Sequence, residues 1–166
     1  SGVGGGLVIG GRVVTGVGGY AGEWGHGPVI RDEYAFPCGC GQVGCVDTVG
    51  SARGMERLHR ARCGADLRSE DIVARWQAGE TAASATLELW RDLVAGPLSM
   101  VLNVVGASIV PVGGGLSRAP GLVAYLDDAV RARVLRATHV ALVVPAICGA
   151  DAGLLGAAMA GESAWG

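Results

Sequence analysis

Four residues have the types and spacing of a metal site, and all four lie in one stretch of the chain: His26, Cys38, Cys40 and Cys45. Their pattern is His-x11-Cys-x-Cys-x4-Cys, and three thiolates with one imidazole complete the tetrahedral shell that is typical of structural zinc. Three glycines between the cysteines allow the backbone to turn tightly enough for these side chains to converge. The alternative interpretation is that the cysteines are buried or incidental. We predict a structural zinc site.

The stretch that carries these ligands, residues 22–47, has few of the apolar patterns that form regular structure. Burial alone therefore cannot order it, whereas zinc contributes about 10 kcal/mol or more in small zinc peptides. The chain has five cysteines, and an odd number with three clustered favours a metal site in a reducing compartment over a disulfide framework. Cys63 and Cys148 lack partners at ligand spacing, so we expect both in the core. His59 and His139 are expected at the surface or its boundary.

Two glycine-rich segments are candidates for ligand contacts. The chain opens with "SGVGGG", whose closely spaced backbone N–H groups suit a phosphate; a glycine-rich entry to a strand is the alternative. The candidate residues of this segment are Ser1, Gly2 and Gly4. The second segment follows a predicted strand and precedes a predicted helix, where ligand clefts form in α/β sheets. Its candidate residues are Gly113, Gly114 and Gly115.

The elements that must position these residues follow from the apolar pattern. Residues 7–15 predict a hairpin around Gly10 and Gly11, and residues 16–50 predict mostly loop. Pro97 should kink or split the longest predicted helix, and Ser69 is the expected N-cap of the second. The order predicts an α/β layer with helices packed on a mixed sheet. Helices are predicted at 51–63, 69–79, 81–105, 121–136 and 152–160, and buried strands at 107–112 and 140–144.

The composition limits the classes of function. The chain has 166 residues, half of them hydrophobic, which favours one domain or one lobe of a larger protein. A net charge of −2 without a basic stripe makes nucleic acid an unexpected partner. There is no lysine, which removes Lys as a nucleophile or phosphate ligand. No apolar run approaches the roughly 20 residues of a membrane span. The chain opens without Met, so we expect a longer parent protein.

The same residues carry a resemblance to a known family. "CGCGQVGC" matches the Cys-x-Cys-Gly-x-x-Gly-Cys signature of the ROK family (repressors, open reading frames and sugar kinases), and "EWGH" matches its Glu-x-Gly-His motif. "SGVGGG" resembles the second phosphate motif of the family, "IVPVGGGLS" its adenosine-side motif and "GADAGLLGAA" its C-terminal helix. The resemblance covers nearly the whole chain. Within the family, the chain looks most like the bacterial N-acetylglucosamine kinases.

This resemblance implies a fold and an activity. The fold is an actin/hexokinase-like (ribonuclease H-like) α/β architecture of two lobes, and residues 1–166 fit its C-terminal lobe, with a zinc-bound loop at 22–47. The activity is that of an ATP-dependent kinase that phosphorylates N-acetylglucosamine or a related hexose at the 6-hydroxyl. The implied cofactor is structural Zn²⁺, and ATP with Mg²⁺ is the implied co-substrate. A cytoplasmic homo-oligomer without membrane contact is expected.

The resemblance also implies roles for individual residues. His26 would give one ring nitrogen to zinc and present the other to a sugar hydroxyl. Without the motif, Glu23 would be interpreted as a solvated loop carboxylate. The family signature usually ends in Glu where this chain has the shorter Asp47. The implied sugar contacts are Glu23, His26, Asp47 and Gly16. On the nucleotide side, the glycine triplet resembles the adenosine-contacting turn, with Leu116 near the base.

ROK kinases bring two further parts from a region before this one: an Asp-x-Gly-x-Thr phosphate motif, and an Asn-Asp pair whose Asp deprotonates the sugar. No aspartate of this chain lies in such a context, and Asp127 and Asp128 are expected on a helix surface. We therefore expect no catalytic residue in this chain, an absent N-terminal lobe, and an inactive fragment. A sugar-responsive repressor of the same family, which would bind nucleic acid, and a stand-alone zinc-binding interaction module are the alternatives.

Overall fold

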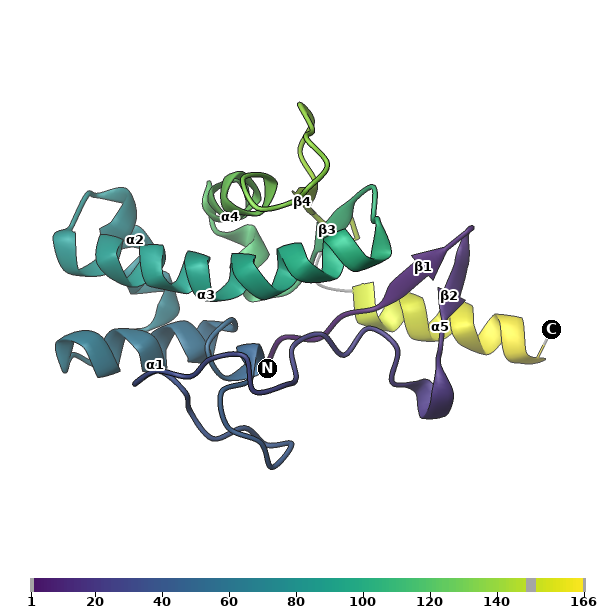
Figure 1. Cartoon of the computed structure of the whole chain (residues 1–166), viewed down its shortest axis with the longest axis horizontal. Coiled ribbons are helices and arrows are strands. Elements are labelled where there is room, and N and C mark those ends of the chain that lie inside the picture. Colours follow the sequence, from purple (N-terminus) through teal and green to yellow (C-terminus); the bar gives the residue numbers. More distant parts are fainter. Residues whose placement is uncertain (1, 149–151, 166) are drawn as a thin grey trace.

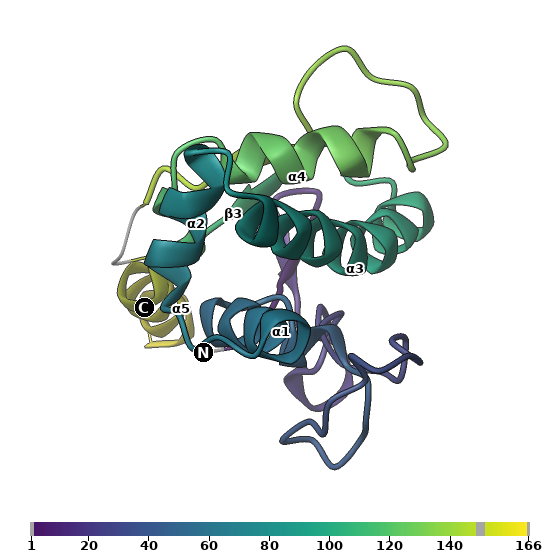
Figure 2. The ribbon, with the colours of Figure 1, turned by 90° about the vertical axis from the view of Figure 1, so that its left-hand side faces the viewer.

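The longest helix, α3 (Thr81–Val105), is the centre of the fold. The structure is a computed structural model that describes residues 2–148 and 152–165. Helix α1 (Ala52–Cys63) packs on one side of α3 and α4 (Leu122–Arg131) on the other, and both views show α3 between them (Figures 1 and 2). The helix predicted at 81–105 is confirmed. Its buried stripe has helical spacing and comprises Leu87, Trp90, Val94, Leu98 and Leu102.

Helix α3 continues through Pro97, so of the predicted kink or split, the split is wrong. Proline removes one backbone hydrogen bond from a helix interior. Val94 and Leu98, on either side of it in sequence, are both buried against the core. Packing of an apolar face supplies most of the stability of protein helices, and here it holds the turns on both sides of Pro97 together.

The two short helices before α3 begin in different ways. The helix predicted at 51–63 begins one residue later as α1, and Ser51 caps it, since its side-chain oxygen accepts from the N–H of Gly54 at 3.1 Å. Helix α2 (Ser69–Gln77) has Arg68 at its N-cap, so the prediction of Ser69 as the cap is wrong. The N–H of Ser69 instead donates to the carboxylate of Glu56 in α1 at 3.0 Å. A long-range partner thus satisfies the helix start.

The strands form two separate two-stranded sheets within residues 2–148 and 152–165, rather than the predicted single mixed sheet. Strands β1 (Leu7–Ile9) and β2 (Arg12–Val14) form the predicted antiparallel hairpin, with Leu7 opposite Val14. Strands β3 (Val110–Val112) and β4 (Val143–Pro145) pair in parallel. The alternation of short strands with helices confirms the α/β class.

Both C-terminal strands are shorter than their apolar runs. The prediction of a buried strand over 107–112 is wrong in length and burial, because only Val110–Val112 pairs and Ile109 is exposed. The N–H of Val110 donates to the carbonyl of Leu142, just before β4, and the carbonyl of Val112 accepts from the N–H of Ala146, just after it. Pro111 lies between these two bonding positions, where its missing N–H costs nothing. The other predicted strand, 140–144, is displaced to 143–145.

The last helices also differ in length from the sequence prediction. Helix α4 ends at Arg131, before the predicted end at 136, and the N–H of Leu135 then donates to Asn103 of α3. Helix α5 (Ala152–Trp165) extends beyond the predicted 152–160. None of the helices in the described ranges is both long enough and apolar enough to cross a membrane.

Four polar or thiol side chains lie where the sequence analysis did not place them. His59 is buried and hydrogen-bonded to Thr86, and Asp127 is buried rather than on the helix surface. Cys63 and Cys148 are exposed, not in the core, because one ends α1 and the other follows β4. Residue spacing along the chain did not reveal that His59 and Asp127 have hydrogen-bond partners in distant segments.

A long irregular segment joins β2 to α1 and carries most of the candidate site. It contains two single turns of 3-10 helix, η1 (Val17–Gly19) and η2 (Val46–Thr48). Figures 1 and 2 show this segment beyond α1, on the side away from α4. A third such turn, η3 (Gly115–Arg118), follows β3. The segment predicted as mostly loop is thus confirmed.

Candidate metal centre and its surroundings

The irregular segment brings the four predicted metal ligands together. One ligand atom from each of His26, Cys38, Cys40 and Cys45 lies within 4.8 Å of the others. The Cys40 and Cys45 sulfurs are 3.7 Å apart, and Nδ1 of His26 is 3.6 Å from the Cys38 sulfur. Around a tetrahedral zinc with ordinary bond lengths, two sulfurs lie about 3.8 Å apart and a sulfur and a nitrogen about 3.6 Å. The donor set and its spacing therefore fit such an ion.

Tight backbone turns produce this convergence. The N–H of Cys38 donates to the carbonyl of Gln42 at 2.8 Å, and that of Gly44 donates to the carbonyl of Phe36 at 2.9 Å. Gly44 has a φ of 83°, and a Cβ there would lie 2.1 Å from the carbonyl oxygen of Ile30. Only glycine combines this conformation with so close an approach.

The thiols of the cluster differ in their surroundings. Cys45 is buried, and burial raises the pKa of its thiol to about 11. Cys40 is exposed, and a hydrogen bond from the Gln42 backbone lowers the pKa of its thiol to about 6. A metal ion must displace the proton of a neutral thiol to bind its sulfur. Cys45 therefore needs the ion to become a thiolate, whereas Cys40 ionises readily without it.

The two ring nitrogens of His26 face different groups. Nδ1 points to the metal cluster, and Nε2 lies 3.7 Å from Oε2 of Glu23. That distance is too long for a direct hydrogen bond. Both side chains are partly exposed, so a ligand can reach them from solvent. The motif "EWGH" thus places one carboxylate and one imidazole nitrogen next to each other at the rim of the cluster.

Asp47 lies beside the cluster and is tied to the start of the chain. Its Oδ1 accepts from the N–H of Val3 at 2.7 Å, and its Oδ2 lies 3.8 Å from the sulfur of Cys38. A Cβ on Gly2 would lie only 1.9 Å from that Oδ1. The predicted sugar residue Asp47 and the predicted phosphate residue Gly2 are therefore neighbours, a contact that sequence spacing did not indicate.

The remaining glycine candidates lie in turns. Gly16 has a φ of 65° and precedes η1, and the carbonyl before it accepts from the N–H of Ala21. Gly114 has a φ of 92° at the cap of η3, next to Gly113 and Gly115. We call residues 22–47, which contain the four candidate ligands, the metal loop. Within the described residues, no hydrogen bond joins the glycine triplet to the metal loop. Gly4 has open space at its α-carbon, and Ser1 lies outside the described residues.

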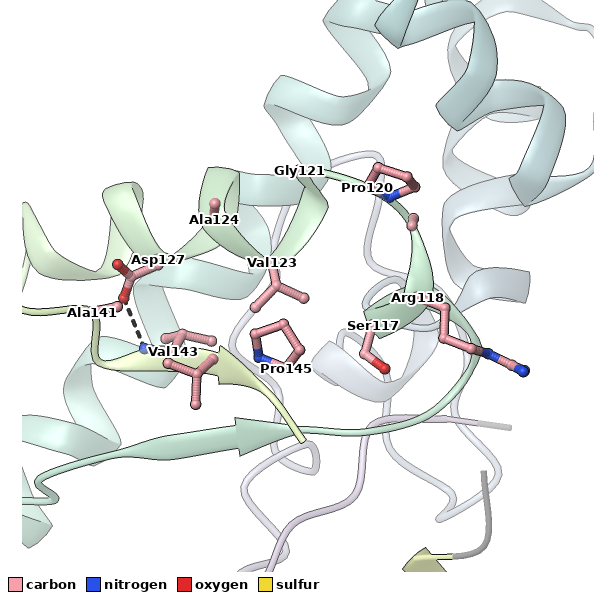
Figure 3. Close-up of a pocket in the computed structure, with 12 residues that line it drawn as sticks. Ser117, Arg118, Pro120, Gly121, Val123, Ala124, Asp127, Ala141, Val143 and Pro145 are labelled. Atoms are coloured by element: carbon pink, nitrogen blue, oxygen red, sulfur yellow. Dashed lines mark hydrogen bonds between the residues drawn. The ribbon is translucent and has the colours of Figure 1, made fainter. Parts of the chain in front are cut away.

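A cavity of about 320 Å³ lies just after the glycine triplet. Figure 3 shows it between α4, which contributes Val123 and Ala124, and β4, which contributes Val143 and Pro145. The segment around Ser117 closes its other side. Leu116, the predicted base contact, packs partly buried against the core beside this cavity. The walls are largely apolar, which suits a flat ring system.

Asp127 at the edge of this cavity holds β4 to α4. Its Oδ1 accepts from the N–H groups of Leu142 and Val143 at 2.9 and 2.8 Å (Figure 3 draws the second bond), and its Oδ2 accepts from Arg131 at 2.8 Å. Sequence reasoning missed this role because the partners lie in a strand that follows in the chain. The sequence did contain one signal of this role, because Asp127 lies on the buried stripe of a predicted helix.

A smaller cavity of about 180 Å³ adjoins the metal loop and was also missed. Cys38 and Asp47 line one side of it, and Arg53 and Arg57 from α1 line the other. Arg57 donates to the carbonyl of Thr48 at 2.7 Å and lies over the ring of Phe36. Helix α1 is thereby fastened to the segment that contains Asp47.

Comparisons with known proteins agree with the motifs. The family model described as ROK family matches residues 1–162. The N-acetyl-D-glucosamine kinases of Citrobacter koseri and Pasteurella multocida are 35% and 36% identical over 95% of this chain and 55% of their own length. The chain thus spans about half the length of the curated relatives it matches.

Solved structures share the fold at similar coverage. A ROK hexokinase from Thermus thermophilus superposes with a TM-score of 0.80 at 31% identity, over 96% of this chain and 53% of that one. A ROK family glucokinase from Streptomyces griseus, in complex with glucose and AMPPNP, gives 0.83 at 26% identity, over 96% and 57%. A ROK family transcriptional regulator, a homologue of the Escherichia coli MLC protein, gives 0.65 at 26%, over 81% and 36%.

Proposed function

The chain belongs to the ROK family, and from that premise we propose that it is the C-terminal lobe of an ATP-dependent sugar kinase. The substrate we propose is N-acetylglucosamine or a related hexose, phosphorylated at the 6-hydroxyl. The single observation that carries the proposal is the metal loop: four convergent ligands, with Glu23 beside the outer nitrogen of His26. The similarity to N-acetyl-D-glucosamine kinases supports the choice of sugar.

The proposed metal is Zn²⁺, held by His26, Cys38, Cys40 and Cys45. A bound ion of this kind supplies structural cross-linking and not reaction chemistry, because a shell of four protein ligands leaves no open position. The loop would gain its order from that cross-link, since it has little apolar surface of its own to bury. His26 would be fixed in one tautomer, with Nε2 directed toward Glu23.

The proposed sugar clamp is Glu23 and His26, with Gly16 and Asp47 as further contacts. A single hydroxyl placed between the carboxylate and Nε2 can donate to the first and accept from the second, because the two atoms are 3.7 Å apart. A charged acceptor makes a stronger hydrogen bond than a neutral one. The pair would therefore orient a sugar ring rather than only hold it.

The proposed nucleotide contacts come from two segments. The segment that contains Ser1, Gly2 and Gly4 would face the phosphates of ATP, which binds with Mg²⁺. The glycine triplet Gly113, Gly114 and Gly115 would approach the nucleoside, with Leu116 near the base. The apolar cavity next to the triplet supports this assignment, since a purine prefers such walls.

Phosphoryl transfer depends on positioning and on a base that takes the hydroxyl proton. We place that base outside residues 1–166, in the part of the relatives that this chain does not match. The chain as a single lobe would then hold the sugar, the ion and part of the nucleotide, and would be inactive alone. A homo-oligomeric parent that works in the cytoplasm, without membrane contact, belongs to the same proposal.

A sugar-responsive transcriptional repressor is the second candidate. The regulator of this family shares the fold of the chain at a TM-score of 0.65. Such a parent would use the same clamp to sense a sugar and would bind nucleic acid through another region. The kinase is preferred because the curated relatives are kinases and match 95% of the chain.

The test is a coupled ADP-release assay on the parent protein with ATP, Mg²⁺ and a panel of hexoses and amino sugars. We expect release with N-acetylglucosamine, and none from the 166-residue chain assayed alone. No release with any sugar, together with binding of operator DNA, would favour the repressor. Robust turnover by the chain alone would contradict the assignment of the base to another region.

A further inference from the structure

The segment Gly2–Gly6 is held against the metal loop at several points. The N–H of Val3 donates to Oδ1 of Asp47 at 2.7 Å. A Cβ on Gly25 would lie 2.1 Å from the carbonyl oxygen of Val3, and a Cβ on Gly5 would lie 2.6 Å from the ring of Trp24. Glycine is required on both sides of this contact because the two backbones touch. The segment therefore takes its position from the loop.

Asp47 is in turn positioned by the metal ligands. It follows Cys45 by two residues within η2, and its N–H donates to the carbonyl of Gly25, next to His26, at 2.9 Å. Its second carboxylate oxygen lies 3.8 Å from the sulfur of Cys38. Movement of the ligands therefore moves the carboxylate that holds Val3.

We propose that Asp47 is a positioning residue that couples the metal site to the segment Gly2–Gly6. Occupancy of the site by zinc fixes the loop, the carboxylate of Asp47 then holds the N–H of Val3, and the segment keeps its conformation. The inference deepens the proposed function, because it names the residue through which the ion sets the position of the predicted phosphate contacts. It rests on the proposed metal site.

The length of the Asp47 side chain is part of this inference. The Oδ1 of Asp47 lies so close to Gly2 that a Cβ there would be at 1.9 Å. A glutamate adds one methylene and would move its carboxylate away from the position in which Oδ1 accepts from the N–H of Val3 at 2.7 Å. Asparagine keeps an oxygen acceptor at the same distance from the backbone, although it lacks the charge. Asp47→Asn should therefore preserve the coupling that Asp47→Ala removes.

The experiment measures amide hydrogen exchange at Val3 by NMR in the 166-residue chain, with zinc and after zinc removal. Asp32→Ala is the matched control, because Asp32 also accepts one backbone N–H, from Tyr34 at 2.9 Å, but does so locally at the surface. Zinc should slow exchange at Val3 about tenfold in the unchanged chain and in Asp32→Ala, because one charged hydrogen bond is gained, and several-fold in Asp47→Asn, whose acceptor is neutral. It should have no effect on Val3 in Asp47→Ala.

A kinetic measurement on the parent protein adds a second readout. Asp47→Ala should raise the KM for ATP several-fold, in addition to the rise in the KM for the sugar that loss of a proposed sugar contact causes, and Asp47→Asn should restore most of the KM for ATP. Equal exchange at Val3 with and without zinc, or protection that survives in Asp47→Ala, would overturn the coupling. Elemental analysis of the same samples separates the two failures: zinc bound without protection overturns the coupling alone, and no bound zinc overturns the metal site with it.

Discussion

At the scale of single residues, the metal loop joins side chains from opposite environments. Cys45 is buried and Cys40 is exposed, and the two sulfurs are 3.7 Å apart. An ion between them would connect the inner part of the loop to its outer turn. The loop should then depend on each ligand, because a site that loses one sulfur loses both affinity and the cross-link.

The first prediction concerns Cys38→Ser. The unchanged chain should hold about one zinc ion by elemental analysis, since four ligands complete one shell, and the variant should hold far less and melt at a clearly lower temperature. Cys63→Ser is the control, because Cys63 is exposed and lies in α1. Equal zinc content in all three proteins would count against the four-ligand assignment.

A second prediction concerns the backbone of the loop. Gly44→Ala should destabilise the chain by more than about 1 kcal/mol, because a φ of 83° and the carbonyl oxygen of Ile30 both exclude a Cβ. Gly39→Ala is the control within the same turn, since a Cβ there meets nothing within 4 Å. Denaturant unfolding of the two variants should separate them, and equal midpoints would show that the turn can adapt.

The convergence of the four candidate ligands could be predicted from the sequence because all four lie in one segment with recognisable spacing. The bond from Asp47 to Val3 could not, since it spans 44 positions and depends on a glycine contact. The outer face of His26 shows the same limit. The motif indicated that a second nitrogen was available, but not that Glu23 lies beside it.

At the scale of elements, three helices provide the support on which the candidate site rests. Arg57 of α1 binds the backbone of η2, and α4 holds β4 through Asp127. Helix α3 lies between α1 and α4. The metal loop and the glycine triplet are therefore connected to one rigid group of helices, although no hydrogen bond in the described part of the chain links them directly.

The third prediction tests the connection between α4 and β4. Asp127→Ala should cost about 3 kcal/mol of unfolding free energy, because it leaves two buried N–H groups without their acceptor and removes one of the two carboxylate partners of Arg131. Asp128→Ala is the control. Asp128 also pairs with Arg131, but its side chain is 71% exposed, so the loss should stay below about 1 kcal/mol. Similar losses in denaturant unfolding would argue against a special role for Asp127.

A fourth prediction concerns pH and the contact between α1 and α3. Burial lowers the pKa of His59, which is hydrogen-bonded to Thr86 at 2.9 Å; nearby Glu80 opposes this shift, and Arg75 and Arg62 add to it. The unfolded chain binds the proton at its ordinary pKa of about 6.5. The contribution of His59 to the free energy of unfolding is therefore fully present above that pKa and declines as the pH falls below it.

Urea midpoints at about pH 7 and pH 5 measure this effect. Lowering the pH should reduce the urea midpoint of the unchanged chain more than that of His59→Gln. Only the unchanged chain has a histidine at position 59 that takes up a proton more readily when the chain is unfolded. His139→Gln is the control, since His139 is exposed. A constant difference across the range would mean that His59 does not titrate on unfolding.

The elements themselves were predicted with uneven success, for physical reasons. Long amphipathic patterns gave α1 and α3 the right bounds to within a residue. The two strands predicted as buried were placed inaccurately because an apolar run reports burial and not pairing, and in this part of the chain 110–112 pairs with 143–145. The N-cap of α2 was predicted wrongly because Glu56, thirteen residues away, pairs the first N–H of the helix.

At the scale of the whole molecule, the chain matches 95% of its own length to only 55% of each kinase relative. The site described above has sugar, ion and nucleotide candidates, and we propose that the base lies in the part of the relatives that this chain does not match, as in an active site divided between two lobes. The motifs predicted this family membership from the sequence. They could not indicate how the two sheets would be arranged, because strand pairing depends on contacts across the fold.

The central claim is that an ion-braced loop presents Glu23 and His26 to a sugar. The most direct measurement is an NMR titration of the zinc-loaded chain with N-acetylglucosamine, compared with the zinc-free chain and with Glu23→Gln. We expect saturable shifts of the Gly16, Glu23 and His26 signals with zinc, lost on removal of the ion and weakened in the variant. The absence of saturable shifts, or identical shifts without zinc, would contradict the claim.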